Sequence, residues 1–212
     1  MIDLSNQEIA NNITQDIYNP DYNSRANHYD EEIVLINRRA CDVVAHLVNV
    51  FIDDKNARIL DIAAGTGLVA IALQRYGFTN MDGLDPSAGM LDKAKEKNLY
   101  HNYYYEGIYA DKKTSVPDEL YDHVLCCASM DDDGLIKFES IEEFLRMMKS
   151  GGYGIIVDRD SFYLKSQQTN EKLFTKLEEE KKLKLITNFS FRNYIKNELV
   201  SLDGRALVFQ KI

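Results

Sequence analysis

Short apolar runs alternate with amphipathic stretches along most of the chain. Runs of strand length occur at residues 58–63, 81–85, 103–106, 121–127 and 153–157. Between them, apolar residues recur at helical spacing, first from Ile36 to Phe51 and then over 68–76, 88–97 and 141–148. Strands that alternate with helices predict an α/β domain with a mostly parallel sheet and helices on both faces.

The pattern changes after residue 160. A long charged stretch, residues 168–184, predicts a surface helix. Two further strands are expected at 191–199 and 206–211. The dipeptide Asp203-Gly204 lies between them and favours a tight turn between antiparallel strands. The pattern predicts five βα-type units closed by a hairpin.

The most informative motif follows the first predicted strand. Leu60–Gly67 reads LDIAAGTG, in which Gly65 and Gly67 let the backbone pass close to a ligand because they have no Cβ. Asp85 closes the next strand, 20 positions after Gly65. A carboxylate there can accept hydrogen bonds from both hydroxyls of a ribose. The combination predicts a nucleoside-cofactor site at the carboxyl edge of a parallel sheet.

Two cofactor classes fit this loop. Residues 65–70 also match the G-x-G-x-x-A form of the nicotinamide-dinucleotide fingerprint. Asp61 argues against it, because a dinucleotide loop usually has an apolar residue there and the helix above must receive a pyrophosphate. S-adenosylmethionine has no phosphate and carries an ammonium group that benefits from a nearby carboxylate. The terminal hairpin also favours S-adenosylmethionine.

Four ordered motifs make the chain resemble the class I S-adenosylmethionine-dependent methyltransferases over most of its length. They are residues 59–67, residues 83–91, residues 121–125 and the turn at 147–153. The N-terminal segment and residues 65–69 are most similar to the methyltransferase-like 27 group. The resemblance implies a Rossmann-like, seven-stranded sheet of order 3-2-1-4-5-7-6 with strand 7 antiparallel.

The resemblance also implies S-adenosyl-L-methionine as cofactor, S-adenosyl-L-homocysteine as product, and a set of binding residues. Asp85 is expected to bind the ribose, Asp61 to orient the ammonium, and Met90 and Ile108 to contact adenine. The full predicted set is Tyr22, Tyr29, Asp61, Ala63, Gly65, Thr66, Gly67, Asp85, Pro86, Ser87, Met90, Ile108 and Cys127.

The segment before the core, residues 22–30, resembles a cofactor-covering arm. Tyr22 and Tyr29 are expected to close over the sulfonium, and Arg25 to pair with the cofactor carboxylate. We therefore predict an arm at residues 1–32 and a single methyltransferase domain at 33–212.

Two positions depart from the family pattern. Ala63 stands where many members have the first glycine, so the backbone has less freedom there. Gly107 stands where an acidic residue often contacts the adenine amine, and Glu106 or Asp111 are the alternatives for that contact.

A general base is needed only if the acceptor arrives protonated. The candidates are His28, Asp131, Asp132 and Asp158. No residue is assigned as catalytic, and no metal site is predicted.

Composition limits the partners. The formal net charge is −9, which disfavours a nucleic-acid acceptor. The one Lys-rich patch, residues 181–184, follows three glutamates and is interpreted as a solvated helix face. The three cysteines have neither disulfide nor zinc spacing, Met1–Thr14 lacks the features of a signal peptide, and no apolar stretch approaches the roughly 20 residues of a membrane span. We expect a cytoplasmic protein without membrane contact.

The leading hypothesis is methyl transfer from S-adenosylmethionine to an acceptor, a small molecule or a protein, with the small molecule favoured. The alternative is a regulatory protein that binds S-adenosylmethionine or S-adenosylhomocysteine without transferring a methyl group. A nicotinamide-dependent oxidoreductase is a third hypothesis.

Overall fold

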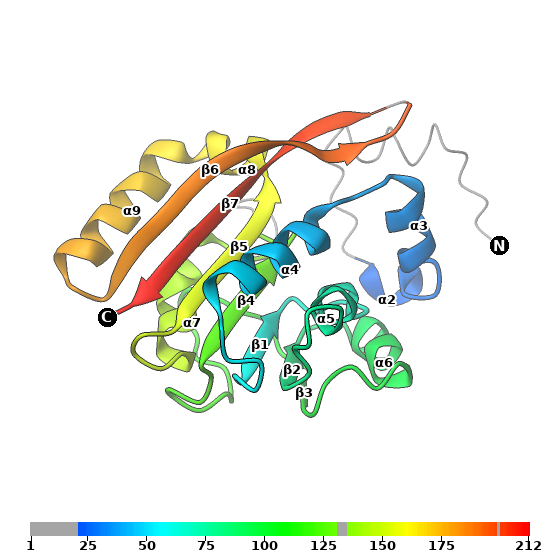
Figure 1. Ribbon diagram of the computed structural model, residues 1–212, viewed down its shortest axis with the longest axis horizontal. Coiled ribbons are helices and arrows are strands. Elements are labelled where there is room, and N and C mark those ends of the chain that lie inside the picture. The colour runs from blue at the N-terminus through cyan, green and yellow to red at the C-terminus, as the bar shows by residue number, and fades with distance from the viewer. Residues whose placement is uncertain (1–20, 131–134, 199) are drawn as a thin grey trace.

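A single seven-stranded sheet organises the computed structural model, which describes residues 21–130, 135–198 and 200–212. The strand order is β3-β2-β1-β4-β5-β7-β6 (Figure 1). The strands are β1 (Ile59–Ile62), β2 (Met81–Leu84), β3 (Tyr103–Tyr104), β4 (His123–Cys127), β5 (Tyr153–Arg159), β6 (Leu183–Lys196) and β7 (Ser201–Lys211). Strand β7 is antiparallel to β5 and β6, and the other pairs are parallel. The predicted fold class and strand order are therefore confirmed.

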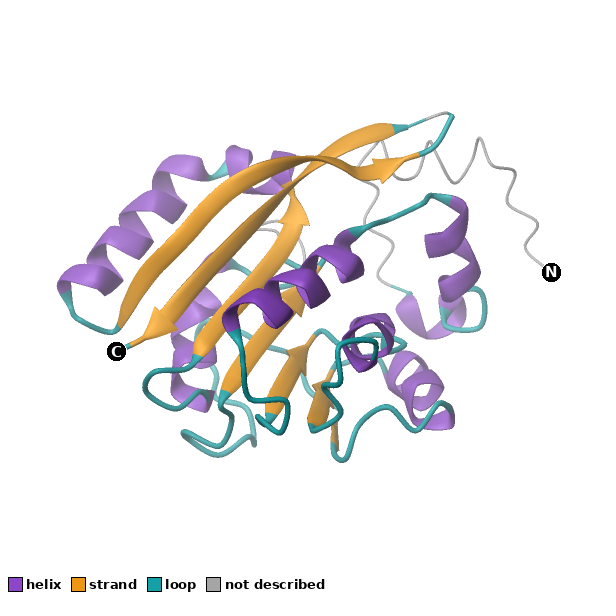
Figure 2. Cartoon of the chain, in the orientation of Figure 1, coloured by secondary structure: helices purple, strands orange, loops and turns teal. Residues whose placement is uncertain are grey.

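Helices flank the sheet on both sides (Figure 2). They are α2 (Tyr22–Arg25), α3 (Tyr29–Leu35), α4 (Ala40–Phe51), α5 (Leu68–Gln74), α6 (Ala88–Glu96), α7 (Ile141–Met147), α8 (Asp160–Lys165) and α9 (Gln167–Glu179), with a 3-10 turn at Phe138–Ser140. Buried residues of α4, α5 and α6 join one apolar cluster, and those of α7, α8 and α9 join a second.

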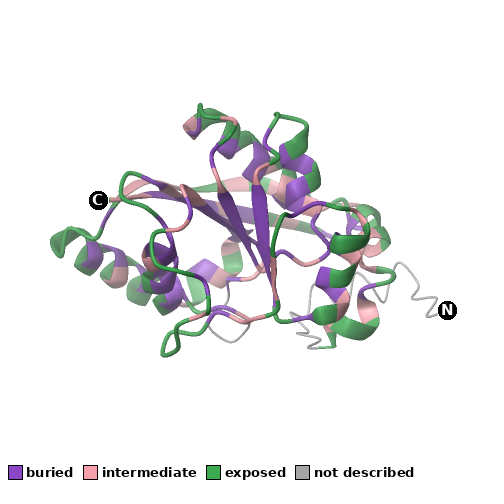
Figure 3. Ribbon diagram, turned by 90° about the horizontal axis from the view of Figure 1, so that it is seen from below, coloured by how far each residue is buried: buried purple, intermediate pink, exposed green. Residues whose placement is uncertain are grey.

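The two clusters follow from the alternation of side chains along each strand. In β1, Ile59 belongs to the cluster under α4 and α5, whereas Leu60 belongs to the cluster under α7. In β5, Ile155 and Ile156 divide in the same way. Figure 3 shows the central strands buried between the two helical layers. Continuous apolar strands are typical of a parallel sheet covered on both faces.

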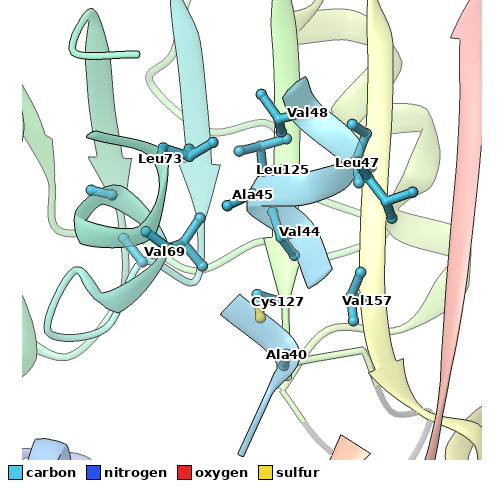
Figure 4. Packing of buried hydrophobic residues seen from close by; sticks show 14 of the residues in the cluster. Ala40, Val44, Ala45, Leu47, Val48, Val69, Leu73, Leu125, Cys127 and Val157 are labelled. Atoms are coloured by element: carbon cyan, nitrogen blue, oxygen red, sulfur yellow. The ribbon is translucent and has the colours of Figure 1, made fainter. Parts of the chain in front are cut away.

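Helix α4 packs against the central strands of the sheet. Its buried face, including Ala40, Val44 and Val48, packs over β4 and β5 near Leu125 and Val157 (Figure 4). The first turn of α4 therefore lies beside the carboxyl ends of those strands. That placement brings the residues just before and within the first turn of the helix toward the predicted cofactor site.

The C-terminal third differs from the sequence prediction in two places. The charged stretch 168–184 is helical only as far as Glu179, in α9, and Lys181 beyond it has a left-handed φ of 54°. Leu183 is fully buried and already pairs in β6 with Lys211. Charge spacing predicts a helix locally, but the burial of Leu183 in the sheet ends it earlier.

The predicted turn at Asp203-Gly204 is wrong. Both residues lie inside β7, and the hairpin connects Lys196 to Ser201. Gly204 pairs with Phe191 and Arg159, and a Cβ on it would lie 2.4 Å from the Phe191 ring. The glycine therefore serves close packing in a strand rather than a turn.

Candidate cofactor site

A cavity of about 340 Å³ opens at the carboxyl ends of β1, β2 and β4. Its walls come from the loops that follow these strands and from helices α2 and α3. Strand order reverses between β1 and β4, and ligands of open α/β sheets bind in the crevice at such a point. The fold therefore places the cavity where the motifs predict a cofactor.

The loop after β1 contains three residues with left-handed backbone. Ala63 has a φ of 57°, Gly65 of 54° and Gly67 of 87°. Ala63 and Gly65 line the cavity. Gly67 is not among the lining residues, and a Cβ on it would lie 2.2 Å from Leu99. Gly65 therefore gives a ligand access to the backbone, whereas Gly67 lets α5 begin beside Leu99.

Asp85 joins the two loops that the motifs identify. Its Oδ2 accepts a hydrogen bond from the Gly65 backbone N–H at 2.9 Å, and its Oδ1 accepts one from the Ser87 N–H at 2.8 Å. Each carboxylate oxygen has a further lone pair for a ligand hydroxyl. Burial raises the pKa of Asp85, and these two hydrogen bonds oppose the rise. Helix α6 is capped by Ser87, not by Asp85.

Asp61 lies beneath the loop and does not line the cavity. It is fully buried, and its Oδ2 accepts a hydrogen bond from the Tyr100 hydroxyl at 2.6 Å. Its Oδ1 has no hydrogen-bond partner in the described structure. Burial raises the pKa of Asp61 to about 7, and the Tyr100 hydrogen bond opposes this. An acid in this state can change its charge near neutral pH.

The predicted wall residues gather around the cavity. Met90 and Ile108 are almost fully buried. The lining includes Thr66, Pro86, Ser87, Met90, Gly107, Ile108 and Cys127.

The two alternatives for the adenine contact lie elsewhere. Glu106 accepts hydrogen bonds from Ser115, and neither Glu106 nor Asp111 lines the cavity. Neither of the two alternatives therefore lies where the adenine contact is predicted.

The described part of the predicted arm lies over the cavity, with Tyr22 and Tyr29 among the lining residues. Asn23 Oδ1 accepts hydrogen bonds from the Ser87 hydroxyl and the Gly89 N–H, which holds α2 on α6.

A second attachment comes from α3. Asp30 accepts hydrogen bonds from the Thr66 hydroxyl and the Lys97 ammonium. Arg25, predicted to pair with a cofactor carboxylate, instead pairs with Glu32 at 2.5 Å. Contacts from α2 and from α3 thus fasten the described part of the arm to the glycine loop and α6.

Arg38 is a cavity residue that the sequence interpretation missed. It precedes α4, lines the cavity, and donates from one terminal nitrogen to the Tyr29 hydroxyl at 3.2 Å. Its Nε is buried without a hydrogen-bond partner, and no carboxylate of the described chain forms an ion pair with it. Neighbouring Arg39 is exposed. Only the docking of α4 on the sheet distinguishes the two arginines.

The predicted base candidates do not gather in the cavity. His28 is half exposed on the arm, and Asp158 accepts hydrogen bonds from the Met130 and Arg159 N–H groups. Neither lines the cavity. Asp131 and Asp132, and Asp133 beside them, lie outside the described residues.

In residues 21–130, 135–198 and 200–212, no group of three or more His, Cys, Asp or Glu side chains is arranged to hold a metal ion. No helix there combines the length and apolar character needed to traverse a lipid bilayer.

Sequence comparison agrees with the position of the site. A methyltransferase-domain family model matches residues 59–152, which run from β1 to the turn before β5. Human methyltransferase-like protein 27 is 30% identical over 161 residues, which are 74% of this chain and 64% of that protein. The chain thus spans less than two thirds of the length of that relative.

Solved structures share the fold at low sequence identity. A chain of the Haloferax volcanii complex that contains the Trm112 methyltransferase activator superposes with a TM-score of 0.65 at 13% identity, over 90% of this chain and 97% of that one. A protein from Methanococcus maripaludis classed as an S-adenosyl-L-methionine-dependent methyltransferase gives 0.60 at 16% identity, over 89% and 93%. The [4+2]-cyclase SpnF gives 0.56 at 15% identity, over 80% of each chain.

Proposed function

Because the chain belongs to the class I methyltransferases by sequence and fold, we propose that it transfers a methyl group from S-adenosyl-L-methionine to an acceptor molecule. One observation carries the proposal. The Asp85 carboxylate and the open backbone of Gly65 meet in one cavity, hydrogen-bonded to each other. This pairing supports a ligand with a ribose diol joined to a short polar tail.

The amino-acid part of such a ligand carries an ammonium and a carboxylate, and the cavity region offers a group suited to each. Asp61 has a buried oxygen without a partner beneath the loop, and it favours the ammonium. Arg38 has a buried Nε without a partner at the cavity wall, and a guanidinium is well matched to a carboxylate. We assign the carboxylate to Arg38 rather than to Arg25, whose charge is already paired with Glu32.

The remaining wall suits the adenosine. Met90 and Ile108 line the cavity with apolar side chains, and Asp85, which is hydrogen-bonded to Gly65, lines it too. The backbone at Gly107, without a Cβ, replaces the acidic contact found in many relatives. We propose that adenine is held chiefly by shape and apolar contact.

When bound, S-adenosylmethionine supplies a methyl group on a sulfonium, which is an excellent leaving group. The protein then needs to align the acceptor and exclude water. Tyr22 and Tyr29 of the arm, with Cys127 at the end of β4, line the cavity where it meets the loops. We propose that residues 1–32 act as the cover of the site and 33–212 as the transferase domain. No general base is assigned.

The acceptor is proposed to be a small molecule or a protein. The formal net charge of −9 disfavours nucleic acid. We also propose a cytoplasmic location.

The first test is calorimetry with S-adenosylmethionine, S-adenosylhomocysteine and NAD. We expect the first two to bind and NAD not to bind. Asp85→Ala removes the diol ligand, and losing two hydrogen bonds to a charged group predicts a loss of roughly 100-fold or more in affinity. Asp92→Ala is the matched control, because Asp92 is an exposed carboxylate on α6. Unchanged affinity of Asp85→Ala would show that the ribose lies elsewhere.

The second test asks whether the protein is an enzyme. The protein is incubated with methyl-labelled S-adenosylmethionine and a metabolite extract or lysate, and the label is followed by mass spectrometry. Transfer that disappears in Asp85→Ala supports the proposal. Tight binding without movement of label would favour the regulatory cofactor-binding protein instead.

A further inference from the structure

Two cysteines from distant parts of the chain meet at the cavity. Cys41 is in the first turn of α4, and Cys127 is the last residue of β4. Both are free thiols and both line the cavity. Figure 4 shows the Cys127 sulfur beside the start of α4, next to Ala40. The packing of α4 on the sheet therefore produces a pair that sequence spacing does not reveal.

Cys127 belongs to the apolar cluster under α4, Cys41 packs against that cluster, and the environments of the two thiols differ. Interaction with the Cys127 thiol, with a smaller contribution from the Arg38 charge, lowers the pKa of Cys41, and burial opposes this. The same interaction, together with burial, raises the pKa of Cys127 well above its usual range. Cys41 is only partly buried, whereas Cys127 is buried. The thiolate is the reactive form of cysteine, so Cys41 is the nucleophile of the pair.

We propose that Cys41 and Cys127 form a redox-sensitive dithiol that a peroxide converts to a disulfide across the cavity wall. The Cys41 thiolate attacks one peroxide oxygen, so that an S–O bond forms, the O–O bond breaks and hydroxide leaves. Cys127 then loses its proton and attacks the Cys41 sulfur, so that the S–S bond forms and the S–O bond breaks. In sum, two thiols and one hydrogen peroxide give one disulfide and two waters.

The position of the pair links oxidation to the contents of the cavity. Peroxide must reach Cys41 at the cavity wall, beside Arg38 and Tyr29. A ligand in the cavity shields the thiols. This link rests on the proposed function, whereas the formation of the disulfide does not.

The test of the disulfide uses the full, reduced chain and hydrogen peroxide, followed by proteolysis and mass spectrometry without reductant. We expect a Cys41–Cys127 linked peptide that dithiothreitol removes. Cys41→Ser and Cys127→Ser should each abolish it. Cys126→Ala is the matched control, because Cys126 is fully buried in the opposite apolar cluster and should leave the linked peptide unchanged.

Thermal unfolding of the reduced variants shows whether each one is folded. The proposal would be overturned if oxidation of wild type yielded only sulfinic or sulfonic acid, only intermolecular dimers, or no modification. It would also be overturned if fragment spectra of the linked peptide placed the disulfide at Cys126 rather than at the adjacent Cys127.

A second arm repeats the oxidation with S-adenosylhomocysteine at about 100 times its dissociation constant, where about 1% of the protein is free. We expect the linked peptide to form roughly 100-fold more slowly. Binding without protection would overturn the link between oxidation and the cavity. Failure of S-adenosylhomocysteine to bind at all would instead contradict the proposed function and leave the disulfide result standing.

Discussion

Asp61→Asn should stabilise the free protein at alkaline pH. The substitution keeps the shape of the side chain and an oxygen that can accept the Tyr100 hydroxyl, but it removes a charge that is fully buried. The wild-type carboxylate must be ionised above pH 7 in a place where one of its oxygens has no partner. Asparagine avoids this cost, since its amide is neutral at every pH.

The magnitude follows from the pKa of Asp61, which burial raises from 3.8 to about 7. Each tenfold change in proton affinity corresponds to about 1.4 kcal/mol, so full ionisation costs up to about 4 kcal/mol. Because the folded pKa is the higher one, the folded state holds the proton longer as pH rises. The wild type therefore loses this stability between pH 4 and pH 7, and the cost is complete above pH 7.

The measurement is urea denaturation of wild type and Asp61→Asn at pH 5 and pH 8. Other acids with raised pKa, such as Asp158, are present in both proteins, so the difference between the two isolates Asp61. We expect Asp61→Asn to be the more stable by about 2–4 kcal/mol at pH 8 and by clearly less at pH 5. A difference that does not change with pH, or a less stable variant at pH 8, would refute the reasoning.

Substitutions at three further positions test the site. Arg38→Met should weaken S-adenosylmethionine binding by roughly 10- to 100-fold in calorimetry, yet leave 5′-methylthioadenosine, which lacks the amino-acid tail, unaffected. Asp30→Asn weakens the contacts to Thr66 and Lys97 and should raise the dissociation rate of S-adenosylhomocysteine about 3- to 10-fold in stopped flow. Ala63→Gly relieves a left-handed alanine and should leave the free energy of unfolding equal to or up to about 1 kcal/mol above wild type, whereas Ala63→Val should lower it by about 2 kcal/mol. The assignment of Arg38 would be contradicted if Arg38→Met weakened the binding of both ligands, and that of Asp30 if the release rate did not change. The account of Ala63 would be contradicted if Ala63→Val were as stable as wild type.

Much of the fold could be predicted because local and global signals agree. The strand β1 is continuous in apolar residues apart from Asp61, and the loop and acid that follow it have fixed roles in an open sheet. The local sequence pattern predicted the wrong secondary structure where tertiary contacts determine it. Gly204 has the chemistry of a turn residue but lies in β7, because the Phe191 ring occupies the space of its missing side chain.

The site was predictable in part for the same reason. Asp85 and Gly65 belong to motifs, and the sheet brings them together. Arg38 and the contact between Cys41 and Cys127 depend on how α4 docks, and no local spacing encodes that. Gly67 illustrates the converse, since its motif position suggests contact with a ligand while its left-handed backbone serves the packing of Leu99.

Features that cost stability gather at one end of the sheet. Among the described residues, three buried side-chain polar atoms lack a partner, and two of them are Asp61 Oδ1 and Arg38 Nε. The left-handed alanines of the described chain are Ala63 and Ala128, which follow β1 and β4, and both line the cavity. Backbone strain and buried charges without a partner are typical of functional sites, where the surrounding structure holds them in place. Under the proposed assignment, a ligand that supplied an ammonium to Asp61 and a carboxylate to Arg38 would remove both unpaired charges at once and would thereby stabilise the folded protein.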